Sequence, residues 1–372
     1  MTPSHLAICV SSLQNVKLFN SNLQIVDEAF EYLVNKSSKG EKGQYFTPRH
    51  VIDMCVKMLN PQRGEYMIDP AAGSCGFPVH SIFHMTGHLF GSTEITPDEK
   101  ADVLKVFGID FDEKAVRVAR TINLIAGDGE TNVLHLNSLD YDRWQEAIET
   151  SEWQLAYGAG YGRLEKKRAE PGNNKSFQFD ILMANPPFAG DIKEGRIIHK
   201  YDLGFKKNGK PHTKLGRDIL FIERNLDFLK PGGRMAIILP QGRFNNTSDK
   251  YIRDFIAERC RILAVIGLHP NTFKPHTGTK TSVLFVQKWD DALCPRVEDY
   301  PIFFAVSEKG GKDNSGEYIY VTDEIGERKL DKSGHFIVEH DLHNHGGELP
   351  NGIAEAFVEF AKTQSLSFWR EG

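Results

Sequence analysis

Short apolar segments alternate with helical patterns along most of this chain, and this alternation restricts the possible fold more than any other feature. Thr47-Pro48 is a typical helix start, with a capping hydroxyl before a proline, and apolar residues then recur at helical spacing as far as Leu59. The alternation continues to about residue 288. Strands that alternate with helices form parallel sheets covered on both faces. The sequence therefore predicts an α/β fold.

Composition limits the class of protein further. A chain of 372 residues can hold one large α/β domain with additions. The five cysteines show no Cys-x-x-Cys pattern, and we interpret the fourteen histidines as solvated or core residues. We therefore expect no disulfide framework and no metal site. No apolar run approaches the roughly 18–20 residues of a membrane span. We expect a cytoplasmic protein without membrane contact.

The tetrapeptide Asn185-Pro186-Pro187-Phe188 directly follows the apolar run 180–184. The amino group of an aromatic base is a poor nucleophile because its lone pair is delocalised into the ring, and two hydrogen-bond acceptors on its N–H bonds would localise that pair. The side-chain oxygen of Asn185 and the carbonyl of Pro186 can be these acceptors, since the prolines fix the backbone. Phe188 can stack on the base. The alternative is a strand that ends in a proline-rich turn.

A glycine-rich turn lies upstream, in residues 66–77, between a short strand and an apolar helix start. Such a turn lets the backbone approach a nucleoside at the carboxyl end of a strand. A second strand, 106–110, ends in Asp110, and a carboxylate can accept hydrogen bonds from both hydroxyls of a ribose. The alternative role for Asp110 is a helix N-cap, for which Asp112 is the better candidate.

These motifs, in this order, resemble those of DNA adenine-N6 methyltransferases, specifically the modification (M) subunits of type I restriction-modification systems. The family's Gly-Glu-Phe-Tyr-Thr-Pro element corresponds to residues 43–48. Further matches occur at 216–221, 229–240, 265–268 and 277–281. The resemblance covers roughly residues 20–310. It implies a Rossmann-like methyltransferase fold that depends on S-adenosylmethionine, with a mostly parallel seven-stranded sheet and helices on both faces.

The resemblance implies S-adenosyl-L-methionine as the cofactor. The residues expected to hold it are Tyr45, Phe46, Thr47, Pro48, Asp69, Ala71, Gly73, Ser74, Asp110, Asn137 and Ser138. Many relatives have an acid near position 137 to receive the adenine amino group, and the amide oxygen of Asn137 can accept the same hydrogen bond. Cys75 stands where the family usually has a glycine. We therefore expect the turn to have less backbone freedom, and cofactor affinity to depend on this residue.

Residues 189–217 carry eight Lys and Arg residues against three acids, although the formal net charge of the chain is −5. A basic loop next to the catalytic tetrapeptide suits a polyanionic backbone, whereas the alternative is a solvated surface loop. The candidate phosphate contacts are Lys206, Lys207, Lys210, Lys214 and Arg217. The resemblance implies duplex DNA as the substrate, with the target adenine flipped out. It also implies a DNA-specificity subunit and a restriction subunit as partners.

Three segments are predicted along the chain. They are a short N-terminal helical segment (1–42), a catalytic domain (43–310) and a C-terminal extension (311–372) with an amphipathic helix at 352–362. We also expect one more strand at 300–306. The stretch 151–178 is interpreted as an insertion that forms a solvated surface loop.

Three alternatives to a type I modification subunit stay open. The first is a self-sufficient DNA adenine methyltransferase, which would methylate its own site when purified. The second is an RNA or protein amide-nitrogen methyltransferase, although such sites often carry Tyr where Phe188 stands. The third is a catalytically dead assembly subunit. The intact Asn185 and Asp69 argue against the third, and cofactor binding would decide it.

Overall fold

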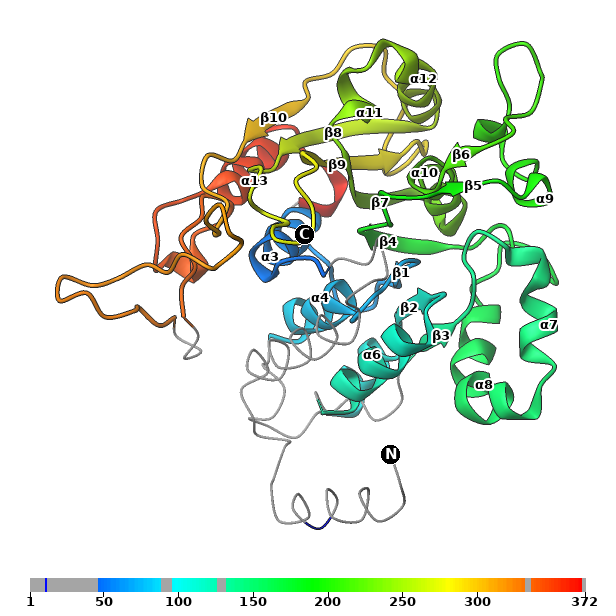
Figure 1. Cartoon of the computed structure of the whole chain (residues 1–372), viewed down its shortest axis with the longest axis horizontal. Helices are drawn as coiled ribbons and strands as arrows, with labels where there is room; N and C mark the ends of the chain where they lie inside the picture. Colours follow the sequence, from blue (N-terminus) through cyan, green and yellow to red (C-terminus); the bar gives the residue numbers. More distant parts are fainter. Residues whose placement is uncertain (1–10, 12–45, 88–95, 126–131, 332–335, 370–372) are drawn as a thin grey trace.

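A central sheet of eight strands organises the protein. The computed structural model describes residues 11, 46–87, 96–125, 132–331 and 336–369. The strands of the sheet are β1 (Met67–Asp69), β2 (Val106–Asp110), β3 (Val133–His135), β4 (Phe179–Ala184), β7 (Leu229–Pro240), β8 (Cys260–Gly267), β9 (Thr281–Lys288) and β10 (Phe303–Val306). Their spatial order is β10-β8-β9-β7-β4-β1-β2-β3 (Figure 1).

The pairing of the strands confirms the predicted α/β class with a mostly parallel sheet. Every neighbouring pair is parallel except the two that involve β9, which runs antiparallel to both β7 and β8. Seven strands were predicted for the sheet itself. The eighth is β10, which forms where the further strand was expected at residues 300–306 and extends the sheet beyond β8.

Helices cover both faces of the sheet because side chains alternate along each strand. On β4, Ile181 and Met183 belong to the apolar core under α3 (Arg49–Leu59), α4 (Gly76–Thr86) and α13 (Ile353–Thr363). Leu182 and Ala184 belong to the core under α8 (Ser151–Glu165), α10 (Arg217–Phe228) and α12 (Lys250–Arg259). The other helices are α5 (Pro97–Val103), α6 (Glu113–Ile125), α7 (Trp144–Ile148), α9 (Gly195–Ile198) and α11 (Gly242–Asn245).

The stretch 151–178 begins with a packed helix, so its interpretation as a solvated loop is wrong. Helix α8 is capped by the Thr150 side chain, which accepts a hydrogen bond from the Trp153 N–H. Its buried residues are Trp153, Gly160, Tyr161 and Leu164. The glycines of this stretch suggested a loop, but Gly160 permits close packing on β3, because a Cβ there would lie 3.1 Å from Leu134.

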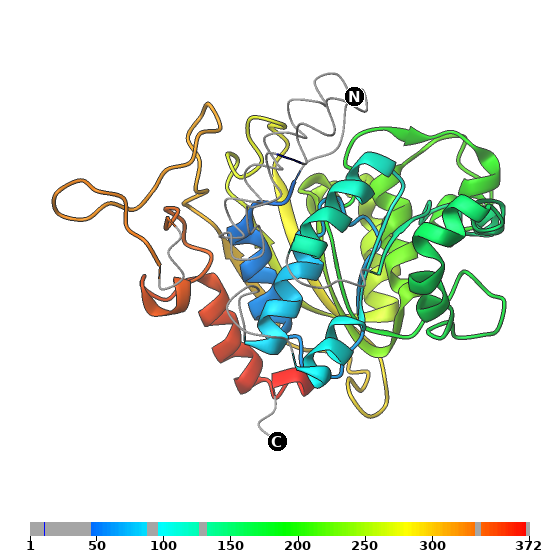
Figure 2. The same cartoon turned by 90° about the horizontal axis from the view of Figure 1, so that it is seen from below.

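The C-terminal part of the chain packs on the α3 side of the sheet. Helix α13 confirms the amphipathic helix predicted at 352–362, and its Phe357 contacts the rings of Phe285 and Phe303. The described residues 307–331 and 336–345 form an arm that projects from the end of the molecule where α13 lies (orange, Figure 2). Isolated bridges close the arm, including one between Gly310 and His340.

Some sequence predictions concern residues that the structure does not describe. The predicted N-terminal helical segment, apart from residue 11, and Tyr45 lie outside the described residues. The division of the chain into three segments stays a prediction. In the described part of the chain, no helix combines the length and the apolar character that a membrane crossing requires.

Candidate active site

The two principal motifs of the sequence meet at one edge of the sheet. Asp69 ends β1, Asn185 follows β4, and these two strands are parallel neighbours with Ile68 opposite Leu182. Because parallel strands end at the same edge, the glycine-rich turn and the Asn-Pro-Pro-Phe tetrapeptide come together there. Strand β2, which ends in Asp110, lies on the other side of β1.

A cavity of about 420 Å³ opens at this edge, within the range of small-molecule sites. The predicted residues in its wall are Phe46, Thr47, Asp69, Ala71, Gly73, Ser74, Asp110, Asn137, Ser138, Asn185, Pro187 and Arg217. Pro48, Pro186 and Phe188 do not form part of this wall. The half-buried Phe188 instead packs with its ring perpendicular to that of Phe273, at a centroid distance of 6.1 Å.

Asn185 presents an unused hydrogen-bond acceptor. Its Nδ2 donates to Thr47 Oγ1 at 3.0 Å, whereas its Oδ1 is buried and has no hydrogen-bond partner among the described residues. A buried acceptor without a hydrogen bond costs about 1–3 kcal/mol of folding free energy. Because Asn185 Oδ1 lies in a cavity wall, this cost indicates that a bound ligand supplies the missing donor. Thr47 fixes the orientation of this amide, a role that the sequence did not reveal.

The buried Asp69 and the half-buried Asp110 support the glycine-rich turn. Asp69 Oδ1 accepts a hydrogen bond from the Ala71 N–H at 3.0 Å, and Asp110 Oδ2 accepts one from the Gly73 N–H at 2.9 Å. Burial raises the pKa of both carboxyls, that of Asp69 well above its ordinary value. Each carboxyl oxygen can accept two hydrogen bonds. A ligand that donates hydrogen bonds would therefore stabilise the ionised forms.

Cys75 lies in the left-handed backbone region. Its φ is 67°, and its N–H donates to the Ala72 carbonyl at 2.7 Å, just before α4 begins. A side chain costs roughly 1–2 kcal/mol in this conformation, which glycine adopts freely. The buried sulfur faces Gly108 on β2, where a Cβ would lie 2.9 Å from it. The turn is therefore tightly packed against the second strand.

Asn137 and Ser138 connect the end of β3 to the glycine-rich turn. Asn137 Oδ1 accepts a hydrogen bond from the Leu139 N–H at 3.0 Å, and Ser138 Oγ donates to the Pro70 carbonyl at 2.6 Å. Both residues line the cavity. Each oxygen retains a lone pair for a ligand.

The cavity wall also contains residues that the sequence analysis did not select. Phe111 directly follows Asp110, is 70% exposed and lines the cavity. An aromatic residue after the acid of the second strand was a usable signal. Glu194 also lines the cavity, but the sequence offered no sign of it. Asp112, another wall residue, accepts from the Lys114 and Ala115 N–H groups, which confirms it as the helix cap.

The basic segment 189–217 is an ordered hairpin and not a single loop. Strand β5 (Asp191–Ile192) pairs antiparallel with β6 (Leu215–Gly216), and α9 lies between them. Arg196 and Lys200 both form ion pairs with Asp140, at 2.6 and 2.8 Å. These two cations are therefore used in holding the segment to the body of the protein.

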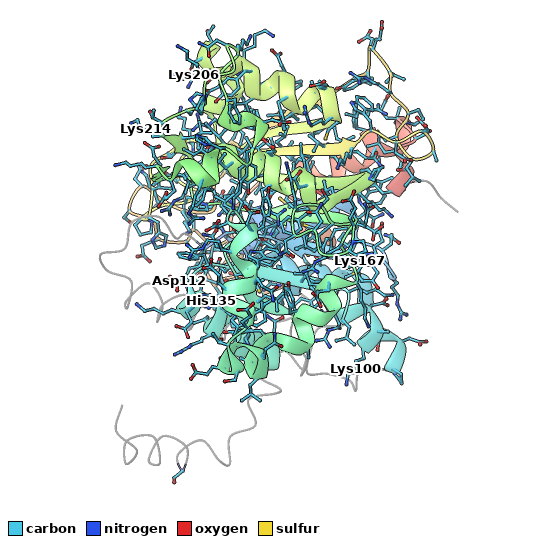
Figure 3. All side chains as sticks on the ribbon, turned by 90° about the vertical axis from the view of Figure 1, so that its right-hand side faces the viewer. Lys100, Asp112, His135, Lys167, Lys206 and Lys214 are labelled. Atoms are coloured by element: carbon cyan, nitrogen blue, oxygen red, sulfur yellow. The ribbon has the colours of Figure 1, made fainter. Side chains whose placement is uncertain are left out.

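The remaining basic residues of this segment are exposed. The five predicted phosphate contacts are all exposed, although Lys214 lies 3.4 Å from Asp191. Figure 3 shows Lys206 and Lys214 toward the same side of the molecule as Asp112, which lines the cavity.

Glu223 on α10 anchors the hairpin by accepting hydrogen bonds from the backbone N–H groups of Asp202 and Leu203. Burial raises the pKa of Glu223 to about 7.

The fold and the cavity together define a class of protein. A protein from Listeria monocytogenes assigned to the class I S-adenosylmethionine-dependent methyltransferases is similar in structure, with a TM-score of 0.55, 18% identity and coverage of 80% of this chain and 76% of that one. The fold is that of S-adenosylmethionine-dependent methyltransferases. Within this class, the chain belongs to the N-6 DNA Methylase family, which it matches over residues 21–340.

Two further similarities specify the relatives. The EcoEI methylase subunit of an Escherichia coli type I restriction enzyme is 25% identical over 69% of this chain, which spans 45% of that subunit. A chain in a solved structure of a type I restriction-modification system has a TM-score of 0.55 and 19% identity, and the match covers 95% of this chain and 63% of that chain. The chain thus spans about half the length of the curated relative.

Proposed function

We propose that this chain transfers the methyl group of S-adenosyl-L-methionine to the N6 amino group of an adenine in DNA, as the modification part of a type I restriction-modification assembly. One observation carries the proposal. The buried Oδ1 of Asn185 has no hydrogen-bond partner in the described part of the chain and lies in the wall of a cavity that also contains the glycine-rich turn. This is an acceptor suited to an amino group and placed next to a nucleoside site.

The cavity has suitable groups for this cofactor. The free lone pairs of Asp110 suit ribose hydroxyls, and the exposed ring of Phe111 offers a stacking face for adenine. The left-handed backbone of Gly73 leaves open space, because no described residue beyond its two chain neighbours comes within 4 Å of the position of a Cβ. When bound, the cofactor supplies an electrophilic methyl group on a positively charged sulfur.

The residues of the chain prepare the amino group for this reaction. The target adenine must leave the duplex, because its amino group is otherwise paired and enclosed. Asn185 Oδ1 then accepts one N–H of the adenine while Thr47 holds the amide in place. The Pro186 carbonyl is the proposed second acceptor and Phe188 the stacking face. A base with a tuned pKa is not required, because the proton on the adenine amino nitrogen becomes acidic only after that nitrogen is methylated. The rate of methyl transfer comes from holding the two reactants close together.

The test of this function is methylation by the purified chain, with and without a type I DNA-specificity subunit. We expect the chain alone to bind S-adenosylmethionine but to methylate DNA weakly, because its net charge of −5 disfavours binding to DNA without a partner subunit. Adding the subunit should produce N6-methyladenine at one recognition site. Modified-base sequencing of host DNA with and without the gene is the independent measurement.

Other outcomes of the same assay would select an alternative. Strong site-specific methylation by the chain alone would identify a self-sufficient enzyme. Transfer to RNA or to a protein amide in place of DNA would contradict the proposed substrate. A chain that does not bind the cofactor would be an assembly subunit that retains only the fold.

The exposed lysines of the hairpin are expected to contact phosphates. Each contact displaces counterions, so log affinity falls with log salt by about 0.9 per phosphate on duplex DNA. Replacing Lys206, Lys207 and Lys210 by Gln should weaken binding for all sequences alike and reduce the slope by about 2–3 if all three reach phosphates. The measurement is a salt titration of DNA affinity in the presence of the specificity subunit.

A matched control is Lys100→Gln on α5, far from Lys206 in Figure 3. This change should leave the salt slope unaltered. Cofactor affinity should be the same in both variants, because the substituted lysines are not part of the cavity wall. If the triple variant kept the original slope, the hairpin would be a solvated surface feature and the grip on DNA would come from a partner.

A further inference from the structure

A cluster of histidines lies outside the cavity, where the arm returns to the body of the protein. His340, His343 and His345 have ring centroids 4.5–4.7 Å apart. The ring of His50 on α3 stacks on His340 at 4.9 Å. Asp53, one helical turn further along α3, has its Oδ2 3.9 Å from His343 Nε2. Side chains from two distant parts of the sequence therefore converge here.

The ring nitrogens of this cluster are poorly satisfied. His343 is 7% exposed, and its Nε2 has no hydrogen-bond partner among the described residues. His340 is 5% exposed, and its Nε2 lies 2.8 Å from His345 Nε2, so at most one proton can occupy the space between them. Buried polar atoms are normally paired. The unpaired nitrogen therefore marks a position where a ligand or ion could bind.

We propose that His340, His343 and His345 form a transition-metal site whose ion is Zn²⁺. Their candidate ligand atoms lie within 4.8 Å of one another. At a Zn–N distance of about 2.0–2.1 Å, two tetrahedral ligands lie about 3.3 Å apart, so a modest inward rotation of the rings completes the site. Asp53 Oδ2 or a water can take the fourth position. Imidazole ligands suit Zn²⁺ among the divalent metals.

The protonation of the rings is compatible with coordination. Burial lowers the pKa of His343 to about 4 and lowers that of His340 still further, so both are neutral at pH 7. Nδ1 of His340 accepts from the Leu342 N–H at 3.1 Å, and Nδ1 of His343 accepts from the His345 N–H at 3.2 Å. Coordination through Nε2 would move the ring proton to Nδ1 and lengthen these two contacts. Two weak hydrogen bonds are a small loss against the free energy of a structural zinc site.

The spacing of the cluster explains why the sequence analysis expected no metal site. That expectation interpreted the histidines as solvated or core residues. Here the spacing is His-x-x-His-x-His, in residues 340–345 at the end of the arm. A bound ion would fasten the end of the arm beside α3. That helix begins two residues after Thr47, which orients Asn185.

The experiment is a metal titration of the complete chain after treatment with a chelator. We expect one Zn²⁺ per chain by calorimetry, with a sub-micromolar Kd, and a Co²⁺ complex with the visible absorption of a tetrahedral site. His345→Asn should weaken Zn²⁺ binding about 100-fold. Asn is chosen because position 345 has a φ of 48°, a left-handed conformation that Asn tolerates. His343→Ala is the second variant.

The control is His84→Asn, an exposed histidine on α4 outside the cluster, which should bind Zn²⁺ like the original chain. Zn²⁺ should raise the melting temperature of the original chain and of this control, but not of the cluster variants. It should also protect the arm from proteolysis. The proposal is overturned if the chain shows no saturable binding at tens of micromolar Zn²⁺, or if His345→Asn and His343→Ala bind Zn²⁺ as tightly as the original.

Discussion

Asn185→Ala is expected to reduce the rate of methyl transfer by about 100- to 1000-fold, the cost of removing one hydrogen-bonding group that acts in the transition state. Affinity for S-adenosylmethionine should remain nearly unchanged. The reason is that the unpaired Oδ1 of Asn185 is the proposed acceptor for the substrate amino group and not for the cofactor. The measurements are single-turnover methylation in the assembled complex and calorimetric titration with cofactor.

Two comparison variants make this assignment specific. Asp69→Ala should weaken cofactor binding first, because Asp69 supports the glycine-rich turn. Thr47→Val should reduce methyl transfer by about 5-fold, the value of one ordinary hydrogen bond, and Thr47→Ser should restore it. An equal loss of cofactor affinity in the Asn185 and Asp69 variants would show that the roles have been assigned wrongly.

Gly108→Ala is the second change with a large expected effect. The new Cβ would lie 2.9 Å from Cys75 Sγ and 3.0 Å from Ala72 Cβ, both in the glycine-rich turn. Forcing a methyl group into such packing costs about 1–3 kcal/mol. Because the glycine-rich turn must shift to make room, we expect this cost to appear as a roughly 5- to 150-fold loss of cofactor affinity. Calorimetry with S-adenosylmethionine measures it.

The matched control is Gly162→Ala, the same substitution on α8. Apart from the backbone of α8 itself, no described residue lies within 4 Å of a Cβ there, and alanine in a helix interior should stabilise the chain by about 0.5–1 kcal/mol. Adding Cys75→Gly to Gly108→Ala should recover part of the affinity, because it removes the sulfur and relieves the left-handed backbone. An unchanged cofactor affinity in Gly108→Ala would mean that the turn does not hold the cofactor.

The parts of the site that could be predicted from the sequence are those determined by local pattern. Strand ends are marked by short apolar runs, and a parallel sheet brings such ends to one edge, so Asp69, Asp110 and Asn185 could be placed together. The chemistry of the tetrapeptide is also local, because acceptor and prolines are adjacent. The fold class followed from the same alternation of strands and helices.

The parts that could not be predicted depend on contacts between distant residues. The hydrogen bond from Asn185 to Thr47 spans 138 positions. The ion pairs of Arg196 and Lys200 with Asp140 make two of the eight cations of segment 189–217 internal anchors. Helix α8 was missed because its glycines resemble a loop in sequence, whereas Gly160 serves close packing on β3. Local propensity has no information about such partners.

The pairing of β1 with β4 has a consequence for how the cavity comes into existence. These strands are far apart in the chain, and the Tyr66 N–H reaches Asp180 Oδ2 across 114 positions at 2.8 Å. Closing so long a loop costs conformational entropy before any stabilising contact forms, so such non-local pairings form slowly. A folding intermediate that has the glycine-rich turn but not this pairing lacks the part of the cavity wall that follows β4, including Asn185. Recovery of methyl transfer during refolding would therefore report the moment at which the centre of the sheet closes.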